Sequence, residues 1–158
     1  MLKLVSKVAT VLSILFLLNS CTDNSTEVVN EEQSTLEKNK EIVINFYQEF
    51  FGDLDFDSAN TYIGDTYIQH NPALADGKEA LIEAAKIWFN GAPTKTIRFN
   101  LVVAEEDLVF VQIIEEVNGN RYSTMDVFRV TNGKISEHWD AFATFKSTDV
   151  SQNDHPLF

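Results

Sequence analysis

The chain has 158 residues, of which 44% are hydrophobic, and this length suits one globular domain with a short appendage. It carries 12 basic against 24 acidic side chains, for a formal net charge of -12. Binding to nucleic acid needs clustered Lys and Arg to displace counterions, so this charge balance argues against a nucleic acid as a partner.

Residues 1–20 have the pattern of a secretory signal peptide. Lys3 and Lys7 precede an apolar run over residues 8–18, which is too short to span a bilayer. The run ends in "LLNSC", which resembles the lipobox of bacterial lipoproteins, in which the cysteine is acylated after cleavage. Cys21 is the single cysteine of the chain, so a disulfide within the chain cannot explain it. The alternative is a stray thiol after an ordinary signal peptide, but we expect Cys21 to be lipidated and to anchor the protein to a membrane of the bacterial cell envelope.

Residues 21–33 are polar and acidic without an apolar period, and we expect them to form a flexible tether. The folded domain is expected over residues 34–146. It should begin with a helix, because Ser34 and Glu37 in "STLE" read as a capping box and Gly52 provides a stop. The apolar positions with helical spacing in this segment are Val43, Phe46, Tyr47, Phe50 and Phe51.

A second short helix is expected over residues 57–63, followed by a short strand over residues 66–69 that ends before Pro72. Asp76 and Glu79 form another cap-like pair at the start of a third helix. The expected buried stripe of this third helix consists of Leu81, Ala84, Ala85 and Trp88.

From residue 96 onward, β-branched and aromatic residues predict strands. Asn118-Gly119 and Asn132-Gly133 are suited to two-residue hairpin turns, which need positive φ. We therefore predict an antiparallel meander that curls around the first helix, within an α+β domain, and a loose tail over residues 147–158. The predicted strands cover residues 97–104, 108–116, 121–130 and 134–145.

The stretch "EHWDAF" places polar residues inside an apolar run. Because side chains alternate along a strand, His138, Asp140 and Phe142 share one face. Residues of the preceding strand that share a face are Tyr122, Thr124, Asp126 and Phe128. If these two faces coincide, a pocket holds two carboxylates and an imidazole among aromatic rings.

Two alternatives to such a pocket stay open. The polar residues could simply face solvent, although Phe128 and Phe142 on the same face are costly to expose. A metal site could use His138, Asp140, His70 and Asp126, but neither an HxH nor an HExxH spacing is present. Nucleophilic catalysis has little support, since the chain lacks a Gly-x-Ser-x-Gly motif.

Three stretches together resemble the SnoaL-like polyketide cyclases of the nuclear transport factor 2-like superfamily. They are "NFYQEFF" (residues 45–51), "YIQHNPALADGKEAL" (67–81) and "DVFRVTNGKISEHWD" (126–140), and the resemblance covers about residues 37–145. It implies a cone-shaped barrel in which a strongly bent antiparallel sheet packs on N-terminal helices around a deep apolar pocket. Members commonly associate through the outer sheet face, so the resemblance implies a homodimer.

The resemblance also implies an activity. The cyclases close a ring by intramolecular aldol condensation without metal or cofactor, and the aspartate of their "HWD" element, here Asp140, is the acid/base. His138 is expected to orient this carboxylate or to bind a substrate oxygen, and His70 to do the same from the opposite wall. Asp126 stands where the cyclases carry a further histidine. Residues expected to contact substrate are Asp126, Asn71, Tyr122, Phe128, Phe142 and Trp88.

Two functions follow from the sequence. The first is a cyclase, isomerase or lyase that uses Asp140 on a small apolar carbonyl compound, with no metal and no cofactor. The alternative is a lipoprotein without catalytic activity that binds a small apolar ligand in the same pocket.

Overall fold

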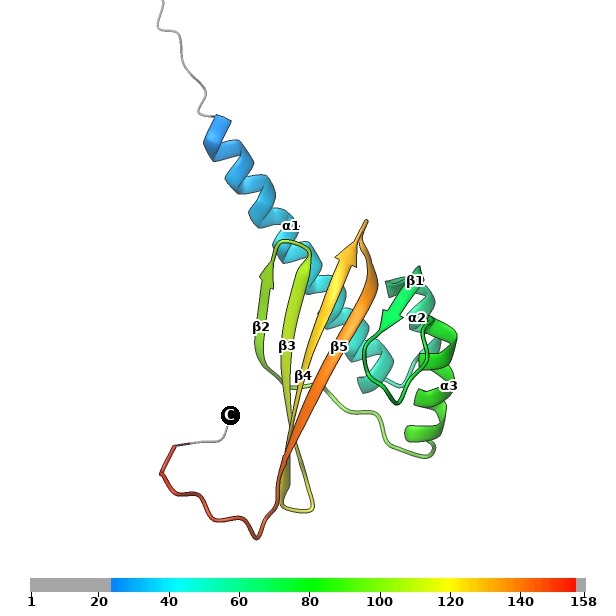
Figure 1. Cartoon of the computed structure of the whole chain (residues 1–158), viewed down its shortest axis with the longest axis vertical. Helices are drawn as coiled ribbons and strands as arrows, with labels where there is room; N and C mark the ends of the chain where they lie inside the picture. The colour runs from blue at the N-terminus through cyan, green and yellow to red at the C-terminus, as the bar shows by residue number, and fades with distance from the viewer. Residues whose placement is uncertain (1–23, 156–158) are drawn as a thin grey trace, which may run out of the picture.

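The computed structural model describes residues 24–155, with side chains described from residue 28 onward. A bent sheet carries the helices on one face, and the long helix α1 (Asn24–Tyr47) crosses that face diagonally (Figure 1). Within the described range, no helix is long and apolar enough to cross a membrane. The predicted signal peptide and the predicted lipidation site, Cys21, lie outside the described residues.

Helix α1 begins earlier than the sequence pattern indicated. It starts at Asn24, so the capping box predicted at Ser34 is wrong: Ser34 and Glu37 lie within the helix and are exposed. The polar residues between Asn24 and Ser34 are helical where an irregular tether was expected. Glu and Gln are good helix formers, and pairs such as Glu37 with Lys40, at 2.7 Å, support a solvated helix.

A five-residue π-helix over Gln48–Gly52 continues α1 and ends at the glycine, as predicted. The Gly52 carbonyl accepts a hydrogen bond from the Lys95 backbone N–H at 2.8 Å. A Cβ atom on Gly52 would lie only 2.7 Å from the Lys95 carbonyl oxygen. Only glycine therefore allows the segment around Lys95 to approach this closely.

Short elements connect α1 to the sheet. A 3-10 helix (η2, Phe56–Ser58) and helix α2 (Ala59–Tyr62) cover the predicted second helix, and strand β1 (Ile63–Gln69) includes the predicted strand. Helix α3 (Lys78–Trp88) follows.

The start and the exposed end of α3 differ from the expectation. Its N-cap is Gly77 with φ 95°, without a side-chain cap, so the predicted Asp76–Glu79 cap is wrong. The Asp76 carboxylate instead accepts from the Gln69 backbone N–H at 2.8 Å. Leu81 and Ala85 are buried as predicted, whereas Trp88 is 53% exposed.

The four later strands follow the predicted meander. They are β2 (Phe99–Glu105), β3 (Leu108–Val117), β4 (Asn120–Thr131) and β5 (Lys134–Phe145). Both residues of each predicted Asn-Gly turn have positive φ, as two-residue hairpin turns require.

The sheet has five strands in the order β1-β5-β4-β3-β2, because β1 adds to the edge of β5. The β1–β5 pairing is parallel, so the sheet is mixed and not wholly antiparallel as expected. It is strongly bent but open, because strands β1 and β2 remain at its two edges. The α+β class and the N-terminal helices packed on a bent sheet are confirmed.

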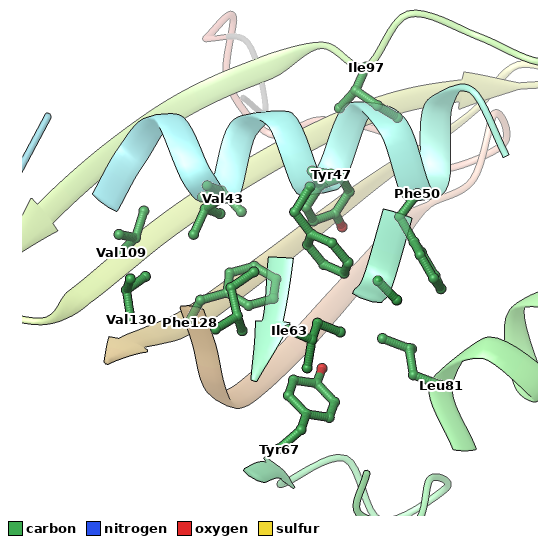
Figure 2. Close-up of a cluster of buried hydrophobic side chains, with 14 of the residues drawn as sticks. Val43, Tyr47, Phe50, Ile63, Tyr67, Leu81, Ile97, Val109, Phe128 and Val130 are labelled. Carbon is green, nitrogen blue, oxygen red and sulfur yellow. The ribbon is translucent and has the colours of Figure 1, made fainter. Parts of the chain in front are cut away.

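The core lies between α1 and the sheet (Figure 2). Phe46 and Phe50 of the first helical segment are fully buried, and the Phe46 ring lies 5.2 Å from that of Phe50 and 6.0 Å from that of Phe128. The aliphatic residues Val43, Val109, Val111 and Ile135 complete its centre. The helical stripe read from the sequence is therefore the face that holds the helix on the sheet.

Truncation of Phe50 tests this packing. Phe50→Ala should lower the free energy of unfolding by about 3 to 5 kcal/mol, because it removes a fully buried ring and leaves a cavity. Phe142→Ala is the matched control, since the Phe142 side chain is 77% exposed. Equal midpoints of urea unfolding for the two variants would contradict the packing described.

Candidate functional site

A cavity of about 220 Å³ lies between the helical layer and the side of the sheet that carries Asp126 and Asp140. Its walls are mainly aromatic and aliphatic, with Phe46, Phe51, Tyr67, Leu81 and Phe128 among them. Polar groups reach it from β4 and β5, and an ion pair between Lys95 and Glu115 lies at its edge. The cavity therefore combines an apolar volume with a few placed polar atoms, which is typical of sites for small molecules.

The register of β4 and β5 confirms that the predicted faces coincide. Asp126 lies directly opposite Asp140, and Phe128 lies opposite His138. All four of these side chains line the cavity. The hairpin thus brings two carboxylates and an imidazole together beside an aromatic ring.

The Asp126 carboxylate is 3% exposed and has a partner on each oxygen. Oδ2 accepts from the Tyr47 hydroxyl at 3.0 Å, and Oδ1 lies 3.0 Å from His138 Nε2. Burial, and after it the charge of Asp126, raises the pKa of Tyr47 well above its usual value, so this phenol stays a donor. Asp126 is consequently fixed between helix α1 and strand β5.

The other ring nitrogen of His138 is also engaged. Nδ1 lies 3.0 Å from Gln69 Oε1 at the end of β1. The ring stacks on Phe128, with centroids 4.7 Å apart, and is 8% exposed. His138 is therefore held on both edges and on one face.

Asp140 is the less enclosed carboxylate. Its Oδ2 accepts from Asn71 Nδ2 at 2.7 Å, and the residue is partly exposed at the cavity. Among the described residues, no hydrogen bond is formed by its Oδ1 atom. Asp140 therefore offers the more accessible carboxylate oxygen of the site, whereas both oxygens of Asp126 are occupied.

The prediction that His70 faces the pocket is wrong. His70 follows β1 but turns to the opposite side of the sheet, where its ring stacks on Trp139 with centroids 4.5 Å apart. Its Nε2 lies 2.8 Å from Glu137 Oε1, and Glu137 also accepts from Arg129. Those contacts hold the imidazole away from the cavity, and its chain neighbour Asn71 reaches Asp140 instead.

This arrangement favours the ionised form of Glu137. The Arg129 hydrogen bond, followed by that of His70, lowers the pKa of the Glu137 carboxyl. Arg129 also donates to both carboxylate oxygens of Asp107 at 2.7 Å. The outer face of the sheet thus carries its own charged network, separate from the cavity.

The residues expected to contact substrate divide into two groups. Trp88 lines the cavity while half exposed, and Phe128 and Asp126 form its sheet wall. Tyr122, Phe142 and Asn71 do not line it; the Phe142 residue is 77% exposed, and Asn71 is hydrogen-bonded to Asp140. Tyr122 and Phe142 lie further along the hairpin than Asp126 and Asp140, toward the start of β4 and the end of β5.

One atom each of Asp126, His138 and Asp140 could approach a shared cation, since these atoms lie within 4.8 Å of one another. The 3.0 Å separation of His138 Nε2 and Asp126 Oδ1 is that of a hydrogen bond. Each of the three side chains already has a protein partner. The contacts that hold these three side chains in place are therefore made by the protein itself.

Sequence reasoning missed two members of the site. Tyr47 was read only as part of the apolar helical stripe, because spacing identifies a buried face but not the partner of a hydroxyl. Gln69 was read only as the last residue of a strand. Its role depends on the pairing of β1 with β5, and no local pattern encodes that pairing.

Comparison with known proteins identifies the same family that the sequence motifs resemble. The model of the SnoaL-like polyketide cyclase family matches residues 41–146, which is more than half of the chain. No curated protein is matched by this sequence.

Solved structures of the same fold are similar at low sequence identity. A protein from Acidithiobacillus ferrooxidans described as a polyketide cyclase is 18% identical, with 66% of this chain and 87% of that chain covered and a TM-score of 0.56. One from Jannaschia sp. CCS1 described as a SnoaL-like polyketide cyclase is 20% identical, with 67% and 85% covered and a TM-score of 0.55. An LEH-like epoxide hydrolase of M. tuberculosis is 16% identical, with 69% and 85% covered and a TM-score of 0.54. At these identities the likeness shows the fold.

Substitution of Tyr47 tests the buried hydrogen bond to Asp126. Tyr47→Phe should lower the free energy of unfolding at pH 7 by about 1 to 3 kcal/mol, because a buried carboxylate loses a donor. The raised pKa of folded Tyr47 adds a pH dependence. The contribution of this shift to the free energy of unfolding is fully present below the pKa of unfolded tyrosine, about 10. It is lost as the pH rises above that value, towards the pKa of folded Tyr47.

Thermal unfolding at pH 7 and pH 11 measures both effects. The wild-type melting temperature should fall more steeply between these pH values than that of Tyr47→Phe. Tyr122→Phe is the control, since the Tyr122 hydroxyl forms no hydrogen bond to any described residue. Parallel pH dependence in wild type and Tyr47→Phe would contradict the assignment.

Proposed function

Because the chain belongs to the SnoaL-like polyketide cyclase family, we propose that its cavity performs acid/base chemistry of the cyclase or isomerase type on a small apolar carbonyl compound. Asp140 is the proton-transferring group. The observation that supports this role is its position: an accessible carboxylate oxygen lies in an apolar cavity beside a fixed Asp126–His138 pair.

The proposed step begins with proton removal. Asp140 takes a proton from a carbon next to a carbonyl group, and the electron pair of the broken C–H bond moves to form an enolate. A carboxylate suffices as base because the enolate places its charge on oxygen. The protonated Asp140 then returns the proton to another carbon of the enolate. Alternatively, the enolate carbon attacks a second carbonyl carbon and closes a ring; the π bond of that carbonyl breaks, and its oxygen takes the proton from Asp140 to become a hydroxyl.

The cavity limits the substrate. Its volume of about 220 Å³ is below the roughly 300–1,000 Å³ of common ligand pockets, which favours a compact compound with about one ring. Three carboxylates line it, and its one lysine is paired with Glu115. An anionic substrate would meet repulsion from Asp126 and Asp140, so a neutral substrate is favoured.

Solvent isotope exchange tests the proposed base. Cyclohexanone is a neutral probe of suitable size, and proton removal next to its carbonyl in D₂O can be followed by loss of ¹H signal in NMR. The wild-type protein should accelerate this exchange, and Asp140→Asn should reduce the acceleration by about 10² to 10⁴, because it preserves shape and removes the base. Asp65→Asn, the same change at an exposed position of β1, should leave the rate unchanged.

The outcome also separates an enzyme from a ligand-binding lipoprotein. An enzyme with Asp140→Asn should still bind cyclohexanone, seen as chemical-shift changes in the cavity residues, while exchange is lost. If the wild-type protein binds the probe and gives no exchange above buffer at any pH, catalysis by Asp140 is contradicted and ligand binding is the remaining function.

We also propose a place for this chemistry, the bacterial cell envelope, with acyl chains on Cys21 as the membrane anchor. The support is the "LLNSC" motif after an apolar run and the absence of a second cysteine in the chain.

A homodimer through the outer sheet face is part of the proposal, since Leu101, Val103 and Met125 of that face are exposed apolar residues. Sedimentation equilibrium of the domain should therefore give the mass of two chains, and the mass of one chain would contradict the dimer.

Lipid anchoring is tested at the cysteine. Cys21→Ser should move the protein from the membrane fraction to the soluble fraction, because a serine at this position is not acylated. Ser20→Ala is the control, and this variant should remain in the membrane fraction. If the Cys21→Ser protein sediments with membranes as wild type does, the anchor is not at this residue.

A further inference from the structure

Residues 69–71 run side by side with residues 138–140, at the end of the pairing between β1 and β5. Gln69 lies opposite His138 in the parallel register, and the chain continues in step beyond it. As a result Gln69 contacts His138, His70 stacks on Trp139, and Asn71 contacts Asp140. Alternation along both segments places the first and third contacts at the cavity and the second on the outer face.

Backbone donors fix the orientation of both amides. The Asn71 backbone N–H donates to Gln69 Oε1 at 2.9 Å, and the Ala73 backbone N–H donates to Asn71 Oδ1 at 2.9 Å. A backbone N–H can only donate, so each of these side-chain atoms must be oxygen. The amide nitrogen of Asn71 therefore faces Asp140, and the amide oxygen of Gln69 faces His138.

This orientation determines where the protons of His138 lie. Gln69 Oε1 only accepts, so His138 Nδ1 must carry a proton and donate it. His138 Nε2 and Asp126 Oδ1 then share one further proton across their 3.0 Å contact. Both ring nitrogens are occupied, which leaves His138 as a fixed polar neighbour of Asp140 and not as a donor to substrate.

The same logic applies to Asp140. Asn71 Nδ2 donates to Oδ2 and so supports the ionised carboxylate and leaves Oδ1 available at the cavity. Residues 69–71 are also held on the outer face, where His70 stacks on Trp139 and contacts Glu137. The His70 backbone N–H also donates to the His138 carbonyl at 2.9 Å.

We infer that Gln69 and Asn71 are positioning residues of the site: Gln69 holds a proton on Nδ1 of His138, and Asn71 sets which oxygen of Asp140 is free to react. The role of Asn71 rests on the proposed function, whereas the role of Gln69 concerns the protein alone. The two are therefore tested by different measurements.

The Gln69 role is tested by ¹⁵N NMR of the imidazole rings. The chain has three histidines, so the spectrum is simple, and His138→Gln identifies the signals of His138. In the wild-type protein at pH 7, Nδ1 of His138 should carry a proton. Gln69→Met removes the acceptor, so at the same pH Nδ1 should be unprotonated while Nε2 keeps the proton that faces Asp126.

Gln69→Glu is the matched variant, because its carboxylate can still accept from Nδ1 and from the Asn71 N–H. It should behave as wild type does. An unprotonated Nδ1 in the wild-type protein, or identical spectra for wild type and Gln69→Met, would overturn the role of Gln69. The ¹⁵N NMR measurement does not depend on activity, so it tests the role of Gln69 even if the isotope exchange proposed above is absent.

The Asn71 role is tested by the pH profile of cyclohexanone exchange. Asn71→Asp keeps the oxygen that accepts from Ala73 and replaces the donor to Asp140 by a second carboxylate. The acid-side midpoint of the exchange rate should rise by about one pH unit or more, because the ionised Asp140 loses a donor and gains a like charge.

Asn60→Asp is the control for added charge, since Asn60 is exposed on α2 and should leave the midpoint unchanged. A merely structural role of Asn71 would lower the rate equally at every pH and leave the midpoint in place, which would overturn the inference. Absence of exchange in the wild-type protein would refute the role of Asn71 together with the proposed function, while the histidine spectra would still judge Gln69.

Discussion

The buried carboxylate of Asp126 is the constraint on which this site depends. A carboxylate with 3% exposure is costly unless its oxygens are paired, and here they are paired by Tyr47 and His138. One partner comes from helix α1 and the other from strand β5. The helix that closes the core and the strand that carries Asp140 are therefore fixed relative to each other by the same charged group.

The parallel edge strand β1 extends this constraint to the rest of the site. Gln69 accepts from His138, and Asn71 donates to Asp140, so the end of β1 and the residues just after it supply a hydrogen-bond partner to each of these two β5 residues. The outer face contributes through His70, which is stacked on Trp139. In the resulting cavity Asp140 is held through Oδ2, while its Oδ1 forms no hydrogen bond to a described residue.

The sequence by itself determined the local features. Residue periodicity located the strands of the meander to within a few residues, and the Asn-Gly pairs fixed the hairpin turns. Hairpins are local, so once the turn at Asn132-Gly133 was identified, alternation was enough to place Asp126 opposite Asp140 and to predict their shared face. The buried stripe of α1 followed in the same way from a period of 3.6 residues, and the resemblance to a known family supplied the bend of the sheet.

Only the tertiary structure decided how distant segments meet. The pairing of β1 with β5 joins residues far apart in the chain, so no local pattern revealed that His70 faces outward, that Gln69 contacts His138 and Asn71 contacts Asp140, or that Tyr47 reaches Asp126. Polar residues at the start of α1 were read as a tether because they lack an apolar period, yet a helix needs no buried face where its side chains are solvated. Periodicity reports which residues are covered; the partner of each polar atom depends on contacts that only the folded chain creates.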